Sequence, residues 1–402
     1  MIILDGISDR ALSGKTPLSA ANTPILDEFA KNGINGIMDP IAPGIRPGSD
    51  TGHLAIFGYD PFKCYPGRGP IEALGVGIKL DSGDVAFRIN FATVDGEGSV
   101  FEKIVTDRRA GRISETNSLI RAVIGRVKIG TQYILAKGTG HRGVLVLKGN
   151  FSEKVSDTDP KKPGEKVKKC LPLEEGAINT ARIVNEFLEQ AHKVLDSHEF
   201  NIKREQKGLP KANAILTRGA GKFKRVISFE EKYKLKFAMI SGTALVKGIA
   251  RFIGGDVIEV KGATGSKDTN INAKIKAAID SLDEYDFVAV HIKATDEFGH
   301  DMDFQGKLKF IEKIDKELSK LFELDFSKVC LIITADHSTP VSVGDHTADP
   351  VPVVICHEGV RVDEVKKYSE FEAYKGGLCR IRGIDLIKIA LDLINKAEKF
   401  GA

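Results

Sequence analysis

Short apolar runs alternate with longer amphipathic segments through much of the chain. Apolar runs that end at a turn are typical of buried strands, and apolar residues spaced three and four apart are typical of helices. The predicted strands are 2–4, 257–260, 287–292, 329–334 and 351–355. Helices are predicted to begin at 24 and after 49, and to cover 233–252, 311–321 and 384–397. This alternation predicts an α/β fold with a mostly parallel sheet covered by helices on both faces.

The middle of the chain has a different pattern. The runs 85–87, 134–135 and 144–147 are rich in β-forming residues and are separated by turns. Residues 179–195 have the spacing of an amphipathic helix, and 157–169 is a lysine- and proline-rich segment predicted to be a solvated loop. We therefore predict a smaller α+β domain, residues 76–214, inserted into a core domain of residues 1–75 and 215–402.

Composition excludes several classes of protein. The 402 residues suffice for two or three domains, and with 42% hydrophobic residues they can bury a large core. The 59 basic and 55 acidic residues are interspersed, so their small difference does not favour nucleic acid as a partner. The five cysteines include no CxxC pair, which argues against a disulfide framework. With no signal peptide or membrane span in the sequence, we expect a cytoplasmic protein.

Carboxylate and imidazole side chains follow three of the predicted strands. In an open α/β sheet the carboxyl ends of parallel strands form one rim, where ligands bind. Carboxylates and imidazoles are preferred ligands of zinc, manganese and similar divalent ions, and paired ions commonly assist phosphoryl transfer. The candidate metal ligands are Asp5, Asp296, His300, Asp336, His337 and His346.

The local spacing supports this interpretation. If 296–300 is a helical turn, Asp296 and His300 lie on one face and can hold the same ion. Any one of these residues alone is more often a cap or turn residue, but six at one predicted rim need a common cause. His192 and His198 lie in polar helical surroundings, so we expect them on the surface.

Ser49 stands between a Gly/Pro-rich loop and a predicted helix start. A helix N-terminus favours an anion such as an alkoxide or a phosphate. A serine in this position is usually a simple N-cap. Beside a two-metal site, however, a metal can lower the pKa of the hydroxyl, which makes Ser49 a candidate nucleophile.

The predicted insertion carries a basic cluster. Arginine side chains can bind carboxylate and phosphate with two parallel hydrogen bonds. Isolated arginines are usually surface residues in salt bridges, but three within five residues beside a glycine favour an anionic ligand. The candidate substrate-binding residues are Asp107, Arg108, Arg109, Arg112, His141, Arg142 and Arg218.

Taken together, these motifs resemble those of the alkaline phosphatase superfamily. The matching segments are 5–6, 48–53, 294–300 and 335–340. Within that superfamily the chain resembles the archaeal type of 2,3-bisphosphoglycerate-independent phosphoglycerate mutase, through segments 57–61, 67–70, 72–77, 107–112 and 261–265. Bacterial relatives have an Asn-Ser-Glu-Val-Gly-His type of motif where this chain has 48–53. Only four residues precede Asp5, so the first strand is short, and whether residues precede it stays open.

The resemblance implies a site with two divalent ions and no bisphosphoglycerate cofactor. One ion would be held by Asp296, His300 and His346. The other would be held by Asp5, Asp336 and His337, with Ser49 as ligand and nucleophile. Manganese, cobalt, magnesium and zinc are all compatible with such ligands. The small-molecule substrate would be a phosphoglycerate, and the sequence does not indicate an oligomeric state.

From these features we predict a mutase that interconverts 3-phosphoglycerate and 2-phosphoglycerate in glycolysis and gluconeogenesis. The phosphoryl group would pass through a phosphoserine at Ser49 while arginines of the insertion hold glycerate and water is excluded. One alternative is a metal-dependent phosphatase, phosphodiesterase or sulfatase with the same metal rim. A less favoured alternative is a non-catalytic protein that binds metal and anions.

Overall fold

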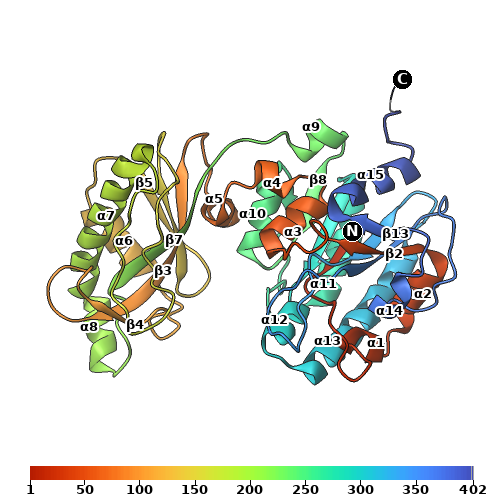
Figure 1. The fold of residues 1–402 in the computed structure, drawn as a ribbon, viewed down its shortest axis with the longest axis horizontal. Coiled ribbons are helices and arrows are strands. Elements are labelled where there is room, and N and C mark those ends of the chain that lie inside the picture. Colours follow the sequence, from red (N-terminus) through yellow and green to blue (C-terminus); the bar gives the residue numbers. More distant parts are fainter. Residues whose placement is uncertain (400, 402) are drawn as a thin grey trace. The chain divides into compact units, whose positions relative to one another are not determined.

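The computed structural model describes residues 1–399 and 401, and it divides into two compact units (Figure 1). The larger unit comprises Met1–Tyr65 and Ile227–Ala402, and the smaller unit Pro66–Val226. The boundaries lie outside those predicted at 75/76 and 214/215, because helix α5 (Arg68–Gly75) and strand β7 (Ala214–Lys222) both belong to the smaller unit. Ala73 of α5 shares an apolar cluster with residues of the smaller unit's sheet.

The larger unit is built on an eight-stranded sheet with the order β13-β2-β12-β11-β1-β10-β8-β9. Strand β12 runs antiparallel to both of its neighbours, and the other pairs are parallel. The predicted mostly parallel sheet is therefore confirmed. The strands are β1 (Ile2–Leu4), β2 (Ile34–Asp39), β8 (Phe237–Ile240), β9 (Asp256–Val257), β10 (Phe287–Ile292), β11 (Leu331–Thr334), β12 (Val351–Cys356) and β13 (Cys379–Arg382).

Helices cover both faces of this sheet, as Figure 1 shows. Helices α3 (Ser49–Ile56), α10 (Ala244–Phe252) and α15 (Gly383–Leu393) pack together on one face. Helices α1 (Pro17–Ala20), α2 (Pro24–Asn32), α11 (Ile271–Asp280) and α13 (Phe304–Leu318) pack together on the other. The remaining helices of this unit are α4 (Pro61–Cys64), α9 (Phe229–Tyr233), α12 (Ala294–His300) and α14 (Glu370–Ala373), with 3₁₀ turns at Ser281–Asp283 and Ser319–Glu323.

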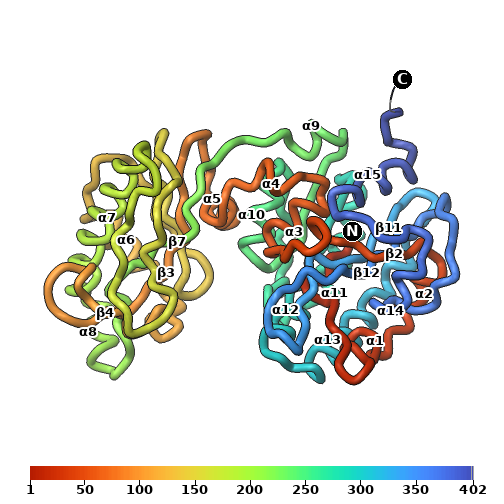
Figure 2. The backbone as a smooth tube through the Cα atoms, viewed as in Figure 1, coloured from red at the N-terminus to blue at the C-terminus, as the bar shows by residue number. Residues whose placement is uncertain are grey.

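Strand β1 lies in the middle of the sheet although it is the first element of the chain. Ile2, Ile3 and Leu4 are all buried, as expected for a parallel strand covered on both faces. Ile2 pairs with Val290 of β10 on one side and with Ile333 of β11 on the other. Figure 2 shows this red N-terminal segment built into the same unit as the blue C-terminal part of the chain. The residue that follows β1 therefore emerges between the carboxyl ends of two other strands.

The smaller unit is an antiparallel α+β structure. Its sheet has the order β4-β3-β6-β5, and β7 pairs with β3. Helix α7 packs on β7 and on α6, and the three elements bury a common core. The elements are β3 (Val85–Asp95), β4 (Ile104–Asp107), α6 (Asn117–Arg126), β5 (Tyr133–Lys137), β6 (Arg142–Leu147), a 3₁₀ turn (Glu175–Ala177), α7 (Ile178–Asp196) and α8 (Glu199–Gln206), with α5 and β7.

The predicted helix 233–252 and the predicted strand 257–260 of the larger unit were wrong in extent. The predicted helix 233–252 is interrupted by strand β8, whose four residues are all buried and pair in parallel with β10. The apolar run Phe237–Ile240 is too short to reveal its period, and tertiary pairing decides its conformation. Of the predicted strand 257–260, only Val257 lies in a strand, as the second residue of β9 at the edge of the sheet.

Two predictions of exposure in the smaller unit were also wrong. Segment 157–169 is a loop, but Thr158 and Asp159 are buried, because Thr158 donates its N–H to Thr217 of β7 and Asp159 pairs with Arg108. His192 is buried in α7, where its Nδ1 lies 2.8 Å from the Asn213 carbonyl. His198 accepts a hydrogen bond from the Phe200 N–H and caps α8.

The five cysteines are all unpaired thiols in the structure. Among the described residues, no helix combines the length and the apolar character that a membrane span requires.

Because each unit has its own hydrophobic core, we predict that a core substitution destabilises only the unit that contains it. Phe187 on α7 and Phe29 on α2 are each fully buried and each contact another aromatic ring in their own unit. We expect Phe187→Ala to lower the unfolding free energy of the smaller unit by about 3–5 kcal/mol. Phe29→Ala should lower the unfolding free energy of the larger unit by a similar amount. Hydrogen exchange in increasing urea should locate each effect. Equal loss of protection in both units for either variant would show that they unfold as one.

Candidate metal centre

The carboxyl ends of three neighbouring strands converge at one rim of the larger sheet. Asp5 follows β1, and Asp336 and His337 follow β11. Asp296 and His300 lie four apart in α12, which begins directly after β10. Because β1, β10 and β11 are parallel neighbours, these side chains meet at one edge, as predicted.

Asp5, Asp336 and His337 form the first group of potential ligands. One potential metal-ligand atom from each residue lies within 4.8 Å of the others, and all three side chains are buried. His337 Nε2 is 3.3 Å from Asp5 Oδ1 and 3.3 Å from Asp336 Oδ2. The structure thus brings together the three residues expected to share an ion.

A second group surrounds Asp296. His300 Nε2 and His346 Nε2 each lie 3.4 Å from Asp296 Oδ1. His346 comes from the loop between β11 and β12, and its ring stacks on His337 with centroids 3.6 Å apart. His337 lies between the two groups. One potential ligand atom from each of Asp296, His337 and His346 also lies within 4.8 Å of the others. Asp345, which the sequence did not single out, lies near His300 and His346.

Ser49 is the first residue of α3, and Gly48 occupies the N-cap position. Its Oγ lies 3.1 Å from His337 Nε2, so the hydroxyl faces the potential ligands. Gly52 allows this arrangement, because a Cβ at that position would lie 2.4 Å from the Asp336 carbonyl oxygen. The helix start therefore sits directly against the β11 loop, and Ser49 is not a simple N-cap.

Two histidines and a lysine at this centre were also missed by the sequence analysis. His291 Nε2 is 2.6 Å from Asp5 Oδ2, and His53 Nδ1 is 3.2 Å from Asp336 Oδ2. Lys293 Nζ contacts Asp296 and lies 3.2 Å from Asp5 Oδ2. A histidine inside the otherwise apolar run of β10, and a histidine one turn after Ser49, are the signals that could have revealed two of them.

Burial and neighbouring charge give the carboxylates unequal acidities. Burial raises the pKa of Asp5 to about 6, and the Asp336 carboxylate adds to this effect. Burial also opposes ionisation of Asp296, but the hydrogen bond from His346 and the charge of Lys293 hold its pKa well below the usual range. For Asp336, burial opposes ionisation, but the interactions with His337 and His53 outweigh it and lower the pKa. The centre thus keeps ionised carboxylates in a buried position.

The imidazoles respond to the same surroundings. Burial tends to lower the pKa of His346, yet its hydrogen bond with Asp296 and the charge of that carboxylate raise it to about 9. His337 is fully buried, and burial lowers its pKa despite the nearby carboxylates. A neutral His337 retains a lone pair with which to bind an ion.

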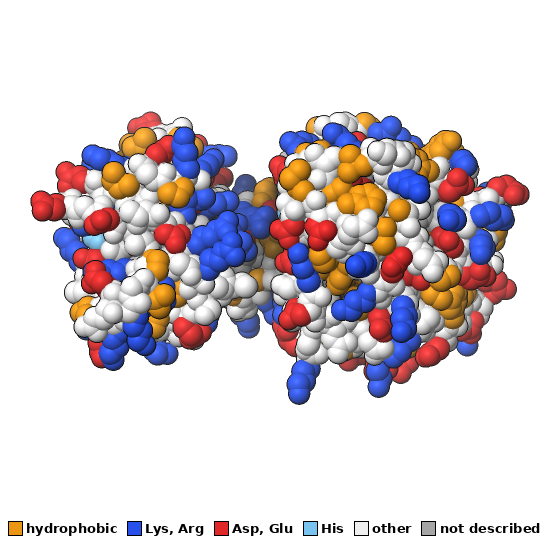
Figure 3. Space-filling view, turned by 90° about the horizontal axis from the view of Figure 1, so that it is seen from below, with side chains coloured by type: hydrophobic (Ala, Val, Ile, Leu, Met, Phe, Trp, Pro, Cys, Tyr) orange, Lys and Arg blue, Asp and Glu red, His pale blue; other side chains and the backbone are white. Residues whose placement is uncertain are grey.

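The smaller unit contains a separate cluster of basic groups. Arg88 on β3 lies opposite Arg218 on β7, and Arg142 begins the neighbouring strand β6. Burial lowers the pKa of Arg88 to about 10, and the charges of Arg142, Arg218 and Arg68 contribute. Burial and nearby arginines, including Arg109, likewise lower the pKa of His141 to about 4. On the face shown in Figure 3, Lys and Arg side chains gather on this unit.

Arg68, Arg88 and Glu72 complete this cluster and were missed by the sequence analysis. Glu72 Oε1 lies 3.0 Å from Arg68 Nε and 3.8 Å from Arg88 Nε. Arg88 is 9% exposed, and its Nε has no hydrogen-bond partner in the structure. Each of these residues is an isolated charge in the sequence, so only the folded sheet brings them together.

Within the predicted basic motif 107–112, some side chains make contacts inside the smaller unit and others are exposed. Asp107 accepts hydrogen bonds from the Arg109 and Gly111 N–H groups, both at 2.7 Å, so it shapes the turn. The Arg108 guanidinium makes two hydrogen bonds of 2.7 Å to Asp159. Arg109 and Arg112 are exposed on this turn. Asp107 and Arg108 thus make contacts within the unit.

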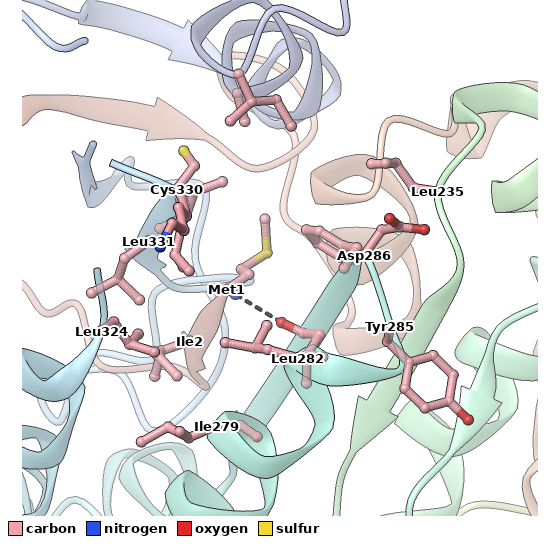
Figure 4. A pocket seen from close by; sticks show the side chains of 18 of the residues that line it. Met1, Ile2, Leu235, Ile279, Leu282, Tyr285, Asp286, Leu324, Cys330 and Leu331 are labelled. Carbon is pink, nitrogen blue, oxygen red and sulfur yellow. Dashed lines mark hydrogen bonds between the residues drawn. The ribbon is translucent and has the colours of Figure 1, made fainter. Parts of the chain in front are cut away.

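A cavity of about 450 Å³ lies at the opposite end of the larger sheet from the metal-ligand candidates. It is lined by apolar side chains such as Ile2, Ile279 and Leu282, and by the start of β10 and β11 (Figure 4). The Met1 amino group donates to the Val288 carbonyl there at 2.8 Å. The cavity contains none of the residues that the sequence predicted for chemistry.

Comparisons with known proteins agree with this geometry. Residues 1–393 match the family model of the Metalloenzyme superfamily. The chain is 61% identical to 2,3-bisphosphoglycerate-independent phosphoglycerate mutase 1 of Archaeoglobus fulgidus, over 100% of this chain and 99% of the relative. The chain belongs to the 2,3-bisphosphoglycerate-independent phosphoglycerate mutases.

Two solved structures share this fold over almost the whole chain, and one of them carries the mutase name. The PH0037 protein from Pyrococcus horikoshii is 40% identical, with a TM-score of 0.87, over 100% of this chain and 98% of that chain. The cofactor-independent phosphoglycerate mutase from Thermoplasma acidophilum is 36% identical, with a TM-score of 0.74, over 98% of each chain. The family and the fold class predicted from the sequence are therefore confirmed.

The potential ligands of this phosphoglycerate mutase suit divalent metal ions. Asp5, Asp296 and Asp336 are each no more than 1% exposed, and burying such carboxylates without cations is strongly unfavourable. Among the described residues no hydrogen bond reaches the buried Asp336 Oδ2, although imidazole nitrogens lie 3.2 and 3.3 Å away. Oxygen and nitrogen ligands of this kind bind divalent ions well.

We expect metal removal to destabilise this phosphoglycerate mutase. A divalent ion at about 100 times its dissociation constant should stabilise the fold by about 2.7 kcal/mol per site, and chelation should remove that contribution. Thermal unfolding of stripped and reloaded protein measures the effect. Asp336→Asn should weaken the response, whereas Asp286→Asn, at the opposite end of the sheet, should retain it. An unchanged Tm on stripping and reloading would rule out a stabilising ion.

Proposed function

We propose that this chain interconverts 3-phosphoglycerate and 2-phosphoglycerate through a phosphoserine at Ser49, with two divalent ions at the rim. The observation that carries the proposal is the position of Ser49. It begins a helix, and its Oγ lies 3.1 Å from His337 Nε2 among buried carboxylates. Family membership supports the choice of substrate, because the relatives carry the name phosphoglycerate mutase.

In this proposal one ion is held by Asp296, His300 and His346, and the other by Asp5, Asp336 and His337 with Ser49. Manganese, cobalt, magnesium and zinc all fit these ligands. When bound, such ions lower the pKa of a serine hydroxyl and neutralise charge on transferring phosphoryl oxygens. His291 and His53 orient the carboxylates of Asp5 and Asp336, which they contact.

The reaction consists of two transfers. The Ser49 hydroxyl gives up its proton, and its oxygen forms a bond to phosphorus as the bond from phosphorus to the C3 oxygen of the substrate breaks. The C3 oxygen takes up a proton, and bound glycerate reorients. Its C2 oxygen then takes the phosphoryl group from Ser49 and gives up a proton, which regenerates the serine hydroxyl. Lys293 and the N-terminus of α3 favour the anionic phosphoryl group throughout.

The arginine cluster of the smaller unit would bind the substrate's anionic groups. Arg88, Arg142 and Arg218 bring like charges together on adjacent strands, and an anion would relieve their repulsion. Arg109 lies close enough to Arg142 to contribute charge, and His141 lies among the same arginines. Asp107 and Arg108 hold the turn that carries Arg109 and Arg112. Retaining glycerate between the two transfers distinguishes a mutase from a phosphatase, and we place the reaction in glycolysis and gluconeogenesis in the cytoplasm.

We expect Ser49→Ala to reduce mutase turnover by about four to six orders of magnitude, as is seen when other covalent nucleophiles are lost. Thr334→Ala is the control, because it removes a buried hydroxyl of β11 that donates to the Pro352 carbonyl. A coupled assay on 3-phosphoglycerate without bisphosphoglycerate measures turnover. Near-normal activity of Ser49→Ala would exclude the covalent route. Phosphate release by the parent protein without isomerisation would favour a phosphatase.

We expect Arg142→Gln to raise the KM for 3-phosphoglycerate by about 10- to 100-fold, because a charge-assisted hydrogen bond contributes about 1.5–3 kcal/mol. Arg182→Gln makes the same change of charge on α7, where Arg182 pairs with Glu186, and it should leave KM unchanged. Steady-state kinetics of the metal-loaded enzyme tests both. Identical KM values in the two variants would argue against substrate binding by Arg142.

A further inference from the structure

Thr339 lies beneath the metal-ligand candidates and connects them. It is fully buried in the loop after β11. Its hydroxyl donates to Asp296 Oδ1 at 2.7 Å and lies 3.0 Å from His337 Nδ1. One hydroxyl therefore touches a carboxylate of one proposed ion site and an imidazole of the other.

The direction of these hydrogen bonds follows from elementary chemistry. A threonine hydroxyl has a single hydrogen, and an ionised carboxylate can only accept. The hydrogen therefore points to Asp296, and the Thr339 oxygen accepts from His337 Nδ1–H. Nε2 of a neutral His337 then carries the lone pair. That nitrogen is the one that lies 3.1 Å from Ser49 Oγ and 3.3 Å from Asp5 Oδ1.

The backbone of Thr339 is held in place by a buried network. Its N–H donates to the Ser8 carbonyl at 3.2 Å, and its carbonyl accepts from Lys307 Nζ at 2.9 Å. Lys307 is fully buried and also donates to Asp9 Oδ2 at 2.9 Å. The loops after β1 and β11 are thereby tied to helix α13.

Two glycines allow the surrounding chain to approach Thr339. A Cβ on Gly6 would lie 2.5 Å from the Thr339 Oγ1 atom, and a Cβ on Gly299 would lie 2.3 Å from the Thr339 carbonyl oxygen. Neither distance is compatible with a side chain in the present arrangement. The hydroxyl is thus confined by close packing as well as by its hydrogen bonds.

We propose that Thr339 is a positioning residue that fixes the Nδ1–H tautomer of His337 and the orientation of Asp296, and so couples the two ion sites. This inference rests on the proposed function. Without the hydroxyl, His337 Nδ1–H lacks its acceptor and Asp296 lacks a donor. Loss of such a supporting partner typically weakens metal binding 10- to 100-fold. Because Thr339 touches residues of both sites, both binding steps weaken.

The test compares Thr339→Val, which removes the hydroxyl at nearly constant shape, with Thr339→Ser, which retains it. Ser338→Ala is the matched control, because it removes a neighbouring buried hydroxyl that donates to the Ser8 carbonyl at 2.9 Å. Manganese titration of metal-stripped protein, in competition with a chelator, gives both dissociation constants. We expect about a 10- to 100-fold weakening of both steps in Thr339→Val. Dissociation constants close to the parent values are expected in Thr339→Ser and Ser338→Ala.

Parent-like manganese binding in Thr339→Val would overturn the proposal. Equal weakening in Thr339→Ser would assign the effect to shape instead of the hydroxyl. A second measurement needs no stable Thr339 variant: imidazole ¹⁵N spectra of the metal-free parent should show His337 protonated at Nδ1. The Nε2–H tautomer would contradict the inference. Metal titration does not require turnover, so absence of mutase activity with this binding pattern would reject only the proposed function.

Discussion

The constraint on which the larger unit depends is the burial of three carboxylates at one point. Asp5, Asp296 and Asp336 come from three parts of the chain and are all nearly inaccessible to water. Their mutual repulsion must be offset by imidazoles, by Lys293 and by bound cations. A parallel sheet meets this requirement, because its central strands deliver one carboxylate each to the same rim. The covering helices then supply Ser49 and His300 from positions directly beside it.

The sequence predicted which side chains follow the strands of the sheet, but it did not predict which distant side chains contact them. Asp5, Asp296 and Asp336 each follow an apolar run, so their meeting at the rim was deducible from the parallel topology. His53 and His291 could be noticed by their positions in the sequence, but the sequence does not show which carboxylate each of them contacts. Strand β8 was missed because four apolar residues between two helical segments fit either period. Its pairing with β10 is a tertiary effect.

The smaller unit shows a second limit of sequence analysis. The arginines of segment 107–112 were predicted to bind an anionic substrate, yet Arg108 makes two hydrogen bonds to Asp159 inside the unit. Arg68 and Arg88 are isolated in the sequence, but the register of β3 and β7 and the position of α5 gather them around Glu72. Clustering like charges on a rigid antiparallel sheet is unfavourable without an anion. The buried Arg88 Nε lies 3.8 Å from Glu72 but makes no hydrogen bond among the described residues, so folding alone leaves its hydrogen-bonding capacity unsatisfied.

The antiparallel direction of β12 determines where the loop between β11 and β12 places Asp336 and His346. Since β12 returns beside β11, both ends of their connecting loop stay at the same rim, and the loop carries Asp336 near its start and His346 near its end. Lengthening or shortening the loop between these residues would shift the reach of one imidazole while leaving the aspartate in register. Small insertions in this loop could thus change the position of His346 relative to Asp296 without rebuilding the sheet.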